Sequence, residues 1–499
     1  MIQKNRVIAF AFLIGSFFLF SECAYDKKEV IPVPVQKVDS TCYPDEIGKI
    51  FVGKCATSGC HNTKSKDAAA GLDLSTWDKL FNGSRGGAAI IPYNLENSFL
   101  VNFINTYDDL GPAQLPTMPN NGTPLTREEV ITVINWIKDG APDCSGNRFT
   151  DNADRRKFYI TNQGCDLVSV WDADRQVIMK YVKVGGDPNL IESPHKVGIS
   201  PDEKFWYVSF TGTNAKYFQK YRTSDDSFVG QLDIGFGSWN TFAFSPDSKT
   251  AYIPDYSTSN GRVAIVDCET MTFKSTPYPN PLPSGCPKPH GSFVSPDGHY
   301  LYLTEQDDNK IYKVDLINIF NSDALSNFPS GYTNPHEIAF SPDNTLYFVT
   351  CQGTNGNSGV LVYRVSDDQF LKKFDNVGGD PVEMAFSPSQ SAPYLFVSCM
   401  TGNAVSIINY LDTTLVKTID APGIFYYPHG VAVDDSKGIC YVINRNLKTA
   451  GGPPPHHTSV CDPNQNNGYL LAIDLNTLEI VQGFKPELSV DPYSIAIRK

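Results

Sequence analysis

Pro335-His336-Glu337-Ile338-Ala339-Phe340-Ser341-Pro342-Asp343, followed closely by Leu346-Tyr347-Phe348-Val349, is the stretch that decides the fold. Its alternating apolar residues predict a short strand, and the aromatic-rich run after Ser-Pro-Asp predicts a second strand. The same pattern recurs from about residue 155 to the end of the chain. A unit that recurs at a regular spacing is typical of repeat architectures, so the period of the repeat becomes the main question.

Seven copies of this unit are found when the chain is aligned on the serine of Ser-Pro-Asp. Asp434 and Arg498 take the place of that serine in the last two copies. The positions five residues before the aligned residue are His195, Asn240, His290, His336, Val382, His429 and Tyr493. Successive copies lie 45 to 50 residues apart, except the last, which an insertion between Asn444 and Tyr469 stretches to 64 residues. A further strand follows in each copy, as in Val168-Ser169-Val170-Trp171. Four strands per unit at this period predict a β-propeller of seven blades.

The two ends of the repeat region predict how the ring closes. The first unit begins at a second strand, Phe158-Tyr159-Ile160-Thr161-Asn162, and the C-terminus supplies a lone first strand at 492–497. One blade would then combine both ends, which leaves no open sheet edge. Motifs such as Tyr159-Ile160-Thr161-Asn162 resemble the Tyr-Val-Thr-Asn class of propellers. That class includes surface-layer-type proteins and is related in shape to the propellers of nitrous oxide reductase and methylamine dehydrogenase. The resemblance covers residues 155–499 and implies a fold rather than an activity.

A different motif lies ahead of the propeller, in Cys55-Ala56-Thr57-Ser58-Gly59-Cys60-His61. Two cysteines with an adjacent histidine predict covalent attachment of haem c, with thioether bonds to Cys55 and Cys60 and His61 ligating the iron. The spacer has four residues instead of the usual two, a length also known in c-type cytochromes. A disulfide or a zinc-type cluster is the alternative interpretation.

Met118, in Leu115-Pro116-Thr117-Met118-Pro119, is the candidate for the second axial ligand. Prolines on either side stiffen the backbone, so a thioether sulfur can be held over the iron, where it raises the reduction potential. Alternatively, Met118 is an ordinary apolar loop residue.

Helix signals flank these candidate ligands. An apolar stripe leads into Cys55, and a capping box precedes a second apolar face. The residues of these signals are Ile47, Ile50 and Phe51 before the motif, Thr126 and Glu129 in the box, and Val130, Val133, Ile134 and Ile137 behind it.

Residues 42–145 resemble the cytochrome c-like domains of secreted bacterial multidomain proteins, of the planctomycete or class I monohaem type. The motifs that carry the resemblance are Gly71-Leu72-Asp73-Leu74, Ser98-Phe99-Leu100, Met118-Pro119, and Asn135-Trp136-Ile137 with Gly140-Ala141. The resemblance implies one haem, with His61 proximal and Met118 distal. The predicted fold class is therefore multidomain: a small all-α cytochrome c-like domain over 42–145, then an all-β seven-bladed propeller over 155–499.

The N-terminus predicts export. Lys4 and Arg6 precede an apolar stretch at 7–20 that is short for a membrane span, so residues 1–22 are predicted to be a signal peptide. Cys23 follows, as in a lipoprotein signal, although Glu22 is unusual before a lipidated cysteine. Plain secretion or an uncleaved anchor is the alternative. We expect a linker over 23–41 and a protein in the periplasm or at the cell surface, anchored to the membrane as a lipoprotein.

The amino-acid composition restricts the class of partner and the cellular compartment. The net charge of −13 argues against nucleic acid, because an acidic protein repels phosphate. Twelve cysteines suit an oxidising compartment. Cys42 and Cys144 lie at the two ends of the cytochrome-like segment and are a plausible disulfide. The pairs Cys268–Cys286 and Cys440–Cys461 are guesses, because connectivity does not follow from sequence.

Four histidines occupy one position of the repeat, the start of the innermost strand: His195, His290, His336 and His429. The second strands should end on the propeller face where the innermost strands begin, which places Glu305, Cys351, Cys399 and Asn444 on that face. The insertion that contains His456 and His457 leaves from the same side. Such groups would suit copper or another transition metal. The alternative is structural: the histidines tie neighbouring blades together by hydrogen bonds, and Asn240, Val382 and Tyr493 interrupt the series.

Three functions are compatible with this layout. The first is an exported electron-transfer cytochrome, whose propeller docks a redox partner protein or a small-molecule electron donor or acceptor. The second is an oxidoreductase with a catalytic or metal centre at the propeller mouth. The third is a hydrolase of the propeller lactonase type, which Pro-His and Thr304-Glu305 resemble. The layout also resembles nitrite reductases that join haem c to a haem-bearing propeller, but those have eight blades.

Overall fold

The computed structural model describes residues 40–498 apart from 258–260, 275–279, 282–285, 287, 319–321, 326–327, 354–357, 390 and 456–460. The described residues belong to one compact unit. None of their helices has the length and apolar character that a membrane crossing requires. The predicted signal peptide, Cys23 and most of the 23–41 linker lie outside the described residues, as do His456 and His457.

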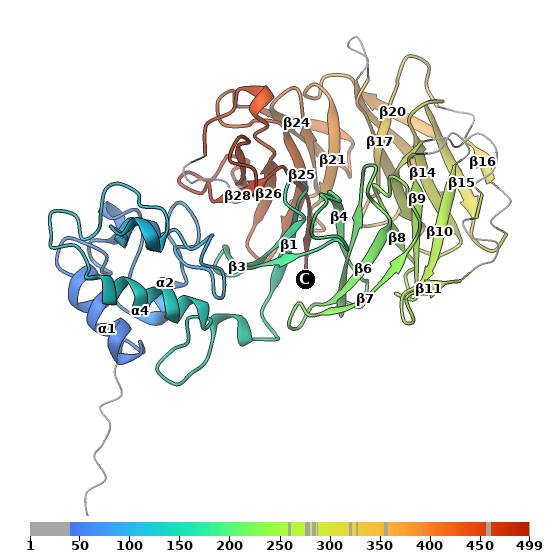
Figure 1. Ribbon diagram of the computed structural model, residues 1–499. Helices are drawn as coiled ribbons and strands as arrows, with labels where there is room; N and C mark the ends of the chain where they lie inside the picture. The colour runs from blue at the N-terminus through green and yellow to red at the C-terminus, as the bar shows by residue number, and fades with distance from the viewer. Residues whose placement is uncertain are drawn as a thin grey trace, which may run out of the picture. The chain divides into compact units, whose positions relative to one another are not determined.

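The part of the chain before residue 157 consists of helices and loops (Figure 1). Its α-helices are α1 (Asp45–Ile50), α2 (Trp77–Leu80), α3 (Leu100–Ile104) and α4 (Arg127–Lys138), and a π-helical turn, η1 (Phe51–Cys55), continues α1. No strand occurs in residues 40–156, all of which are described. The predicted all-α domain is therefore supported in part, since only α4 exceeds six residues and loops predominate.

The two predicted helix signals fold as expected. Thr126 accepts a hydrogen bond from the Glu129 backbone N–H while the Glu129 side chain accepts one from the Thr126 N–H, which satisfies two N–H groups at the start of α4. The apolar face of α4 is buried, with Trp136 added to the four predicted residues. Trp136 packs edge-on against Phe51 of η1, with ring centroids 5.8 Å apart. This contact joins the helix that ends at Cys55 to the terminal helix.

Seven antiparallel sheets follow, which confirms the seven-bladed propeller (Figure 1). The blades, each given from its inner strand outward, are as follows. Blade 1 contains β29 (Pro492–Ile497), β1 (Lys157–Asn162), β2 (Leu167–Asp172) and β3 (Val177–Lys183); blade 2 contains β4 (Pro194–Ile199), β5 (Phe205–Phe210), β6 (Tyr217–Arg222) and β7 (Phe228–Asp233). Blade 3 contains β8 (Ala243–Phe244), β9 (Thr250–Asp255), β10 (Arg262–Asp267), β11 (Thr272–Phe273) and β12 (Asn280–Pro281), the last two both pairing with β10; blade 4 contains β13 (Pro289–Val294), β14 (Tyr300–Glu305), β15 (Lys310–Asp315) and β16 (Ser322–Ala324). Blade 5 contains β17 (Pro335–Phe340), β18 (Leu346–Cys351), β19 (Gly359–Arg364) and β20 (Phe370–Phe374); blade 6 contains β21 (Pro381–Phe386), β22 (Tyr394–Cys399), β23 (Ala404–Asn409) and β24 (Thr414–Asp420); blade 7 contains β25 (Pro428–Asp434), β26 (Ile439–Asn444), β27 (Asn467–Asp474) and β28 (Glu487–Val490).

The ring closes through blade 1, as predicted from the chain ends. The C-terminal strand β29 pairs with β1, with Phe158 opposite Ile497 and Ile160 opposite Ile495. Neighbouring blades are linked by a recurring hydroxyl of the second strand, because Thr161, Thr304 and Thr350 each donate to a backbone carbonyl on the inner strand of the next blade, at His195, His336 and Val382. The threonine of the Tyr-Ile-Thr-Asn motif is therefore an inter-blade contact.

The helical domain packs on the outer strand of blade 1. Val177 and Met179 of β3 are part of its hydrophobic core. Arg175 donates to the Asp78 carboxylate at 2.6 Å, which adds a polar contact beside this core. Because the domain covers β3, one outer strand of the propeller is protected from pairing with other chains.

Two disulfides form among the described cysteines. Cys42 and Cys144 are bonded, as predicted, whereas the second bridge joins Cys165 to Cys461. The guesses that paired Cys440 with Cys461 and Cys268 with Cys286 are wrong, because Cys440, Cys268 and Cys286 are buried free thiols. Cys165 lies in the β1–β2 turn of blade 1, and ring closure brings it to the blade 7 insertion, a proximity that sequence spacing does not reveal.

An ion pair inside the propeller joins blade 1 to blade 2. Lys157 and Asp226 lie 2.9 Å apart with fully buried side chains, and Tyr159 donates to the other Asp226 oxygen at 3.1 Å. Burial lowers the pKa of Lys157, and Asp226 opposes this effect. A buried charge without its partner is strongly destabilising, so each member of the pair depends on the other.

We expect Asp226→Ala to lower the free energy of unfolding by about 3–5 kcal/mol, because it leaves the Lys157 ammonium buried without its carboxylate. Denaturant unfolding followed by fluorescence measures the change. The matched control is Asp225→Ala, at the exposed neighbouring position, with an expected effect within about 0.5 kcal/mol. Equal effects of the two variants would contradict the role of the ion pair.

Candidate functional site

The Cys55–His61 loop folds back on the helix that precedes it. The Cys60 N–H donates to the Thr57 carbonyl and the His61 N–H donates to the Cys55 carbonyl, both at 3.1 Å. Cys55 is buried and Cys60 is exposed, and both are free thiols. Burial raises the pKa of Cys55 to about 11, so its sulfur is held as a neutral thiol.

The alternatives to haem attachment find no support in this geometry. Cys55 and Cys60 form no disulfide with each other. Within the described part of the chain, no group of three or more His, Cys, Asp or Glu side chains is arranged to hold a metal ion. Two free thiols in one short loop remain available for thioether bonds.

His61 carries the donor that a haem iron requires. Burial lowers the pKa of His61, with a smaller opposing effect from the Leu72 backbone, so the ring is neutral near pH 7 and keeps a lone pair. Its Nδ1 atom is buried and lacks a hydrogen bond of normal geometry. The Leu74 N–H donates to the His61 carbonyl at 2.8 Å, which ties the histidine to the Gly71-Leu72-Asp73-Leu74 segment. Asp73 in turn accepts from the Ser75 N–H at 3.0 Å and stabilises that turn.

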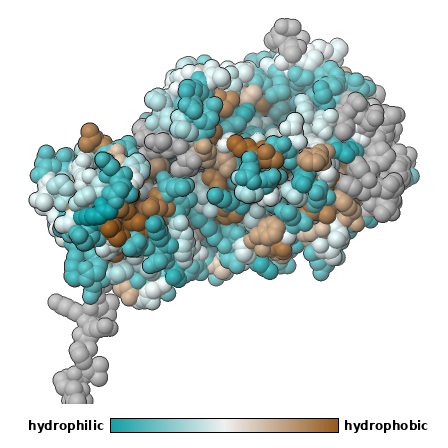
Figure 2. All heavy atoms as spheres, in the orientation of Figure 1, coloured by the Kyte–Doolittle hydropathy of each residue, from teal (hydrophilic) through white to brown (hydrophobic). Residues whose placement is uncertain are grey.

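Met118 lies on a loop docked to α3. Its N–H donates to the Phe103 carbonyl at 2.7 Å, and Gln114 donates in the same way to Asn102 at 2.8 Å. The Met118 side chain packs, half-buried, against the same hydrophobic core as Cys55. Figure 2 shows hydrophobic side chains at the surface of this domain. Cys55 belongs to this core, Cys60 is exposed in the same loop, and the His61 backbone is hydrogen-bonded to Leu74 of the core. Two thiols, a neutral imidazole and a thioether are the donor set of a haem c site, so the residues present fit this group.

The propeller brings its four repeat histidines together. Their rings and that of Tyr493 form a closed circle of contacts at the propeller centre. In order around the circle, the ring centroids are separated by 6.0 Å for His195–His290, 3.8 Å for His290–His336, 5.9 Å for His336–His429, 3.7 Å for His429–Tyr493 and 4.1 Å for Tyr493–His195. We call these five residues the central ring. Two of the contacts skip a blade, at Asn240 and at Val382.

The predicted structural role of these histidines is supported at three blade contacts. The Val382 backbone beside His336 and the Tyr493 backbone beside His429 each oppose the lowering of the histidine pKa that burial causes. His290 Nδ1 lies 3.2 Å from the His336 carbonyl of the next blade. Burial lowers the pKa of all four histidines, and that of His290 to about 4, so the rings are neutral at physiological pH. The central ring is therefore made of uncharged aromatic side chains.

A second layer of side chains, which the sequence reasoning missed, faces the same axis. Lys196, Glu337 and Glu383 each follow a repeat position by one residue, on inner strands of blades 2, 5 and 6. They interact electrostatically across the ring of blades. A β-bulge in the inner strand of each of these blades places an extra residue beside the repeat position. The sequence signal that could have identified this second layer is a charged residue directly after the repeat position.

The other groups expected at the propeller mouth do not join the central ring. Glu305 accepts backbone N–H groups of Lys288 at 3.3 Å and Asp307 at 2.8 Å, and Cys399 lies 3.8 Å from the Ser406 hydroxyl. Thr304 donates to the next blade and accepts from the Gly291 N–H. These groups stabilise turns and blade contacts. The convergence of thiols and carboxylate with the imidazoles and the lactonase-like use of Thr304 and Glu305 stay predictions. The additional transition metal has no supporting site among the described residues.

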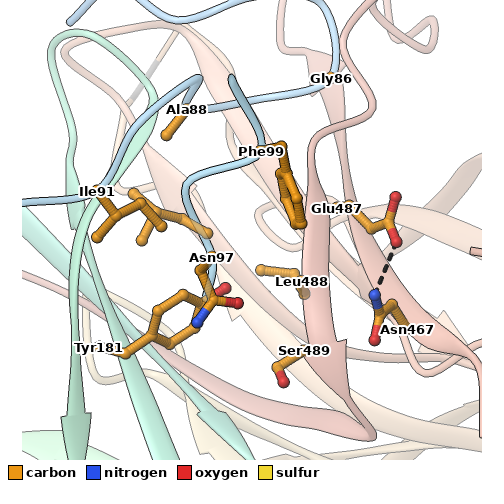
Figure 3. Close-up of a pocket in the computed structure, with 11 residues that line it drawn as sticks. Gly86, Ala88, Ile91, Asn97, Phe99, Tyr181, Asn467, Glu487, Leu488 and Ser489 are labelled. Carbon is orange, nitrogen blue, oxygen red and sulfur yellow. Dashed lines mark hydrogen bonds between the residues drawn. The ribbon is translucent and has the colours of Figure 1, made fainter. Parts of the chain in front are cut away.

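A small pocket lies where the helical domain meets blades 1 and 7 (Figure 3). Phe99 and Ile91 line it from the helical domain, and Tyr181 and Leu488 line it from the propeller. The Asn467 side chain donates to Glu487 at 2.8 Å in its wall. Its volume of about 20 Å³ has room for about one water molecule, so the pocket is a packing gap rather than a haem or substrate site.

Residues 58–119 match the family described as planctomycete cytochrome C. The matched span contains Cys60, His61 and Met118, and begins after Cys55. No curated protein matches the chain.

Solved structures show similarity at low sequence identity. Hydrazine synthase of Kuenenia stuttgartiensis is 17% identical with a TM-score of 0.49, over 59% of this chain and 90% of that chain. A functionally unknown protein from Desulfotomaculum acetoxidans is 15% identical with a TM-score of 0.51, over 68% and 98%. The dihydro-haem d1 dehydrogenase NirN in complex with DHE is 12% identical with a TM-score of 0.47, over 87% and 97%. The Desulfotomaculum acetoxidans match supports the fold alone.

The family match and the seven sheets lead to one description of the chain. It carries a cytochrome c domain of the planctomycete type, matched over residues 58–119, together with a seven-bladed β-propeller.

Proposed function

We propose that this protein is an exported c-type cytochrome that transfers electrons through one covalent haem. The observation that carries the proposal is the donor set of the helical domain: free thiols at Cys55 and Cys60, a neutral imidazole at His61, and the Met118 thioether, which packs against the same hydrophobic core as Cys55. The haem supplies a one-electron couple at its iron. We assign no substrate chemistry to this domain.

Each residue of the set has a distinct role in the proposal. Cys55 and Cys60 fix the porphyrin to the protein, one from the buried and one from the exposed side of the loop. His61 would hold the iron through its neutral nitrogen, and the hydrogen bond from the Leu74 N–H to the His61 carbonyl fixes the backbone that carries the ring. Met118 would supply a soft sulfur donor, which would favour the reduced iron and raise the potential.

The propeller serves, in this proposal, as a rigid platform that docks a redox partner protein or presents a small-molecule electron donor or acceptor. Support comes from the packing of β3 into the core of the helical domain, which couples the two parts mechanically. The net charge of −13 favours a partner with a basic contact surface.

Export and membrane attachment remain part of the proposal. The predicted signal peptide at 1–22 and a lipid anchor on Cys23 would place the protein in the periplasm or at the cell surface. The two disulfides, Cys42–Cys144 and Cys165–Cys461, support an oxidising compartment.

Covalent haem is tested by expressing the full chain with haem c maturation machinery and measuring haem per chain after denaturation. We expect one haem per wild-type chain, a large reduction in Cys55→Ala and Cys60→Ala, and loss of the low-spin spectrum in His61→Ala. Cys268→Ala, at a buried free thiol of the propeller, is the matched control and should keep full haem content. Wild-type protein without covalent haem would refute the proposed function.

The distal ligand is tested separately by potentiometry. Met118→His should lower the midpoint potential by a few tenths of a volt, within the roughly 0.8 V range that axial ligands cover. Met179→Leu changes a methionine packed in the same core and should leave the potential nearly unchanged. An unchanged potential in Met118→His would show that another group ligates the iron.

A further inference from the structure

The central ring presents hydrogen-bond acceptors that the protein itself does not use. His195 Nδ1 lies 3.3 Å from the Gln163 side-chain oxygen and His290 Nδ1 lies 3.2 Å from a backbone carbonyl. The backbone carbonyl beside His290 can only accept, so the proton of this ring is on Nδ1 and its Nε2 carries a lone pair. His195 is 7% exposed, and its Nε2 is buried without a hydrogen-bond partner.

The second layer adds carboxyl groups beside these lone pairs. Glu337 accepts the Ile338 N–H at 3.1 Å, and neither Glu337 nor Glu383 forms an ion pair within the described part of the chain. Lys196 donates to the Thr241 hydroxyl at 3.0 Å, not to a carboxylate. Lys196, Glu383 and Ser494 are half-buried although all three lie on inner strands, so solvent reaches the axis on this side of the ring.

We propose that the centre of the propeller binds a small primary ammonium compound, in the class of the ammonium ion or methylammonium. Its N–H groups donate to the imidazole lone pairs and to a carboxyl group, and its positive charge lies against the faces of aromatic rings. This site does not depend on the haem or on the proposed electron transfer.

The carboxyl groups near the central ring favour this ligand over an anion. Arg445, which lies 4.9 Å from the Tyr493 ring centroid, donates two hydrogen bonds to Asp491, at 2.6 and 3.0 Å, and its charge adds to the effect of burial in lowering the pKa of His195 and of His429. Glu337 and Glu383 are the carboxyl groups near the ring, and both add to the effect of burial in raising the pKa of Tyr493. A cation can take the place of the acidic proton of Glu383, so its binding leaves the net charge of the site unchanged, whereas an anion would meet two carboxyl groups and several lone pairs.

Binding should release a proton. Burial and the neighbouring Glu337 raise the pKa of Glu383 to about 8, so this carboxyl is protonated at pH 7. A bound ammonium favours the carboxylate, and the Glu383 proton then passes to solvent. The positive charge of the ligand replaces that of the proton, so no charge is left unbalanced. Affinity should therefore rise between about pH 6 and pH 8, while the ligand itself stays protonated.

The experiment is calorimetric titration of the full chain with methylammonium and with ammonium, at pH 7 in two buffers of different ionisation enthalpy. We expect saturable binding at one site per chain with release of a fraction of a proton. Potassium, which is similar in size to ammonium but has no N–H group, should not compete, and tetramethylammonium should not bind. Binding of potassium with equal affinity would overturn the hydrogen-bonding assignment.

Variants locate the site. His195→Phe keeps an aromatic ring but removes the Nε2 acceptor, and should weaken binding at least tenfold. Glu383→Gln should abolish the proton release and flatten the pH profile. His299→Phe and Glu269→Gln change exposed residues and should behave as wild type. Circular dichroism establishes that each variant is folded.

Three results would overturn the proposal. The first is the absence of saturable methylammonium binding to the folded wild-type chain. The second is binding that His195→Phe and Glu383→Gln leave unchanged. The third is a transition metal retained at one per chain in the propeller and lost in His195→Phe, because the metal would then occupy the lone pairs.

Discussion

The pairing of β29 with β1 is the interaction on which the rest of the propeller depends. Six blades are continuous in sequence, whereas blade 1 is complete only when the C-terminal strand returns to the first strand of the ring. The same closure brings Cys165 to Cys461 and places Asp491 beside Arg445. It also supplies Tyr493, which closes the circle of aromatic rings between His429 and His195. Without this strand pairing, the central ring would be open.

Buried polar groups link the blades in a repeated way. Lys157 and Tyr159 of blade 1 share the two oxygens of Asp226, and Lys313 and Tyr302 of blade 4 share those of Asp368. Each carboxylate lies in an outer turn of the following blade. Hydroxyl groups on the second strands also link the blades, because Thr304 of β14 and Thr350 of β18 each donate to the inner strand of the next blade. A satisfied buried network specifies one arrangement, because any other leaves charges and hydroxyls unpaired.

The two candidate centres differ in how the chain assembles them. Cys55, Cys60 and His61 lie within one loop, and a local turn brings the histidine back to the first cysteine. The central ring draws its five residues from five blades that span nearly 300 residues of sequence. Its geometry therefore depends on strand register and on the β-bulges, which decide whether a residue faces the axis or a neighbouring blade. A local site tolerates changes elsewhere in the fold, whereas a site at the axis depends on every blade.

Sequence alone was sufficient for what is local or periodic. The cytochrome c-type domain, the capping box at Thr126, the seven repeats and the closure through blade 1 could all be predicted, because they depend on short spacings and a regular period. Tertiary structure decided the rest. Cys165 rather than Cys440 pairs with Cys461 since only ring closure brings the two turns together. Lys196, Glu337 and Glu383 reach the axis because bulges turn one extra residue of each inner strand towards it, and strand alternation by itself does not predict that displacement.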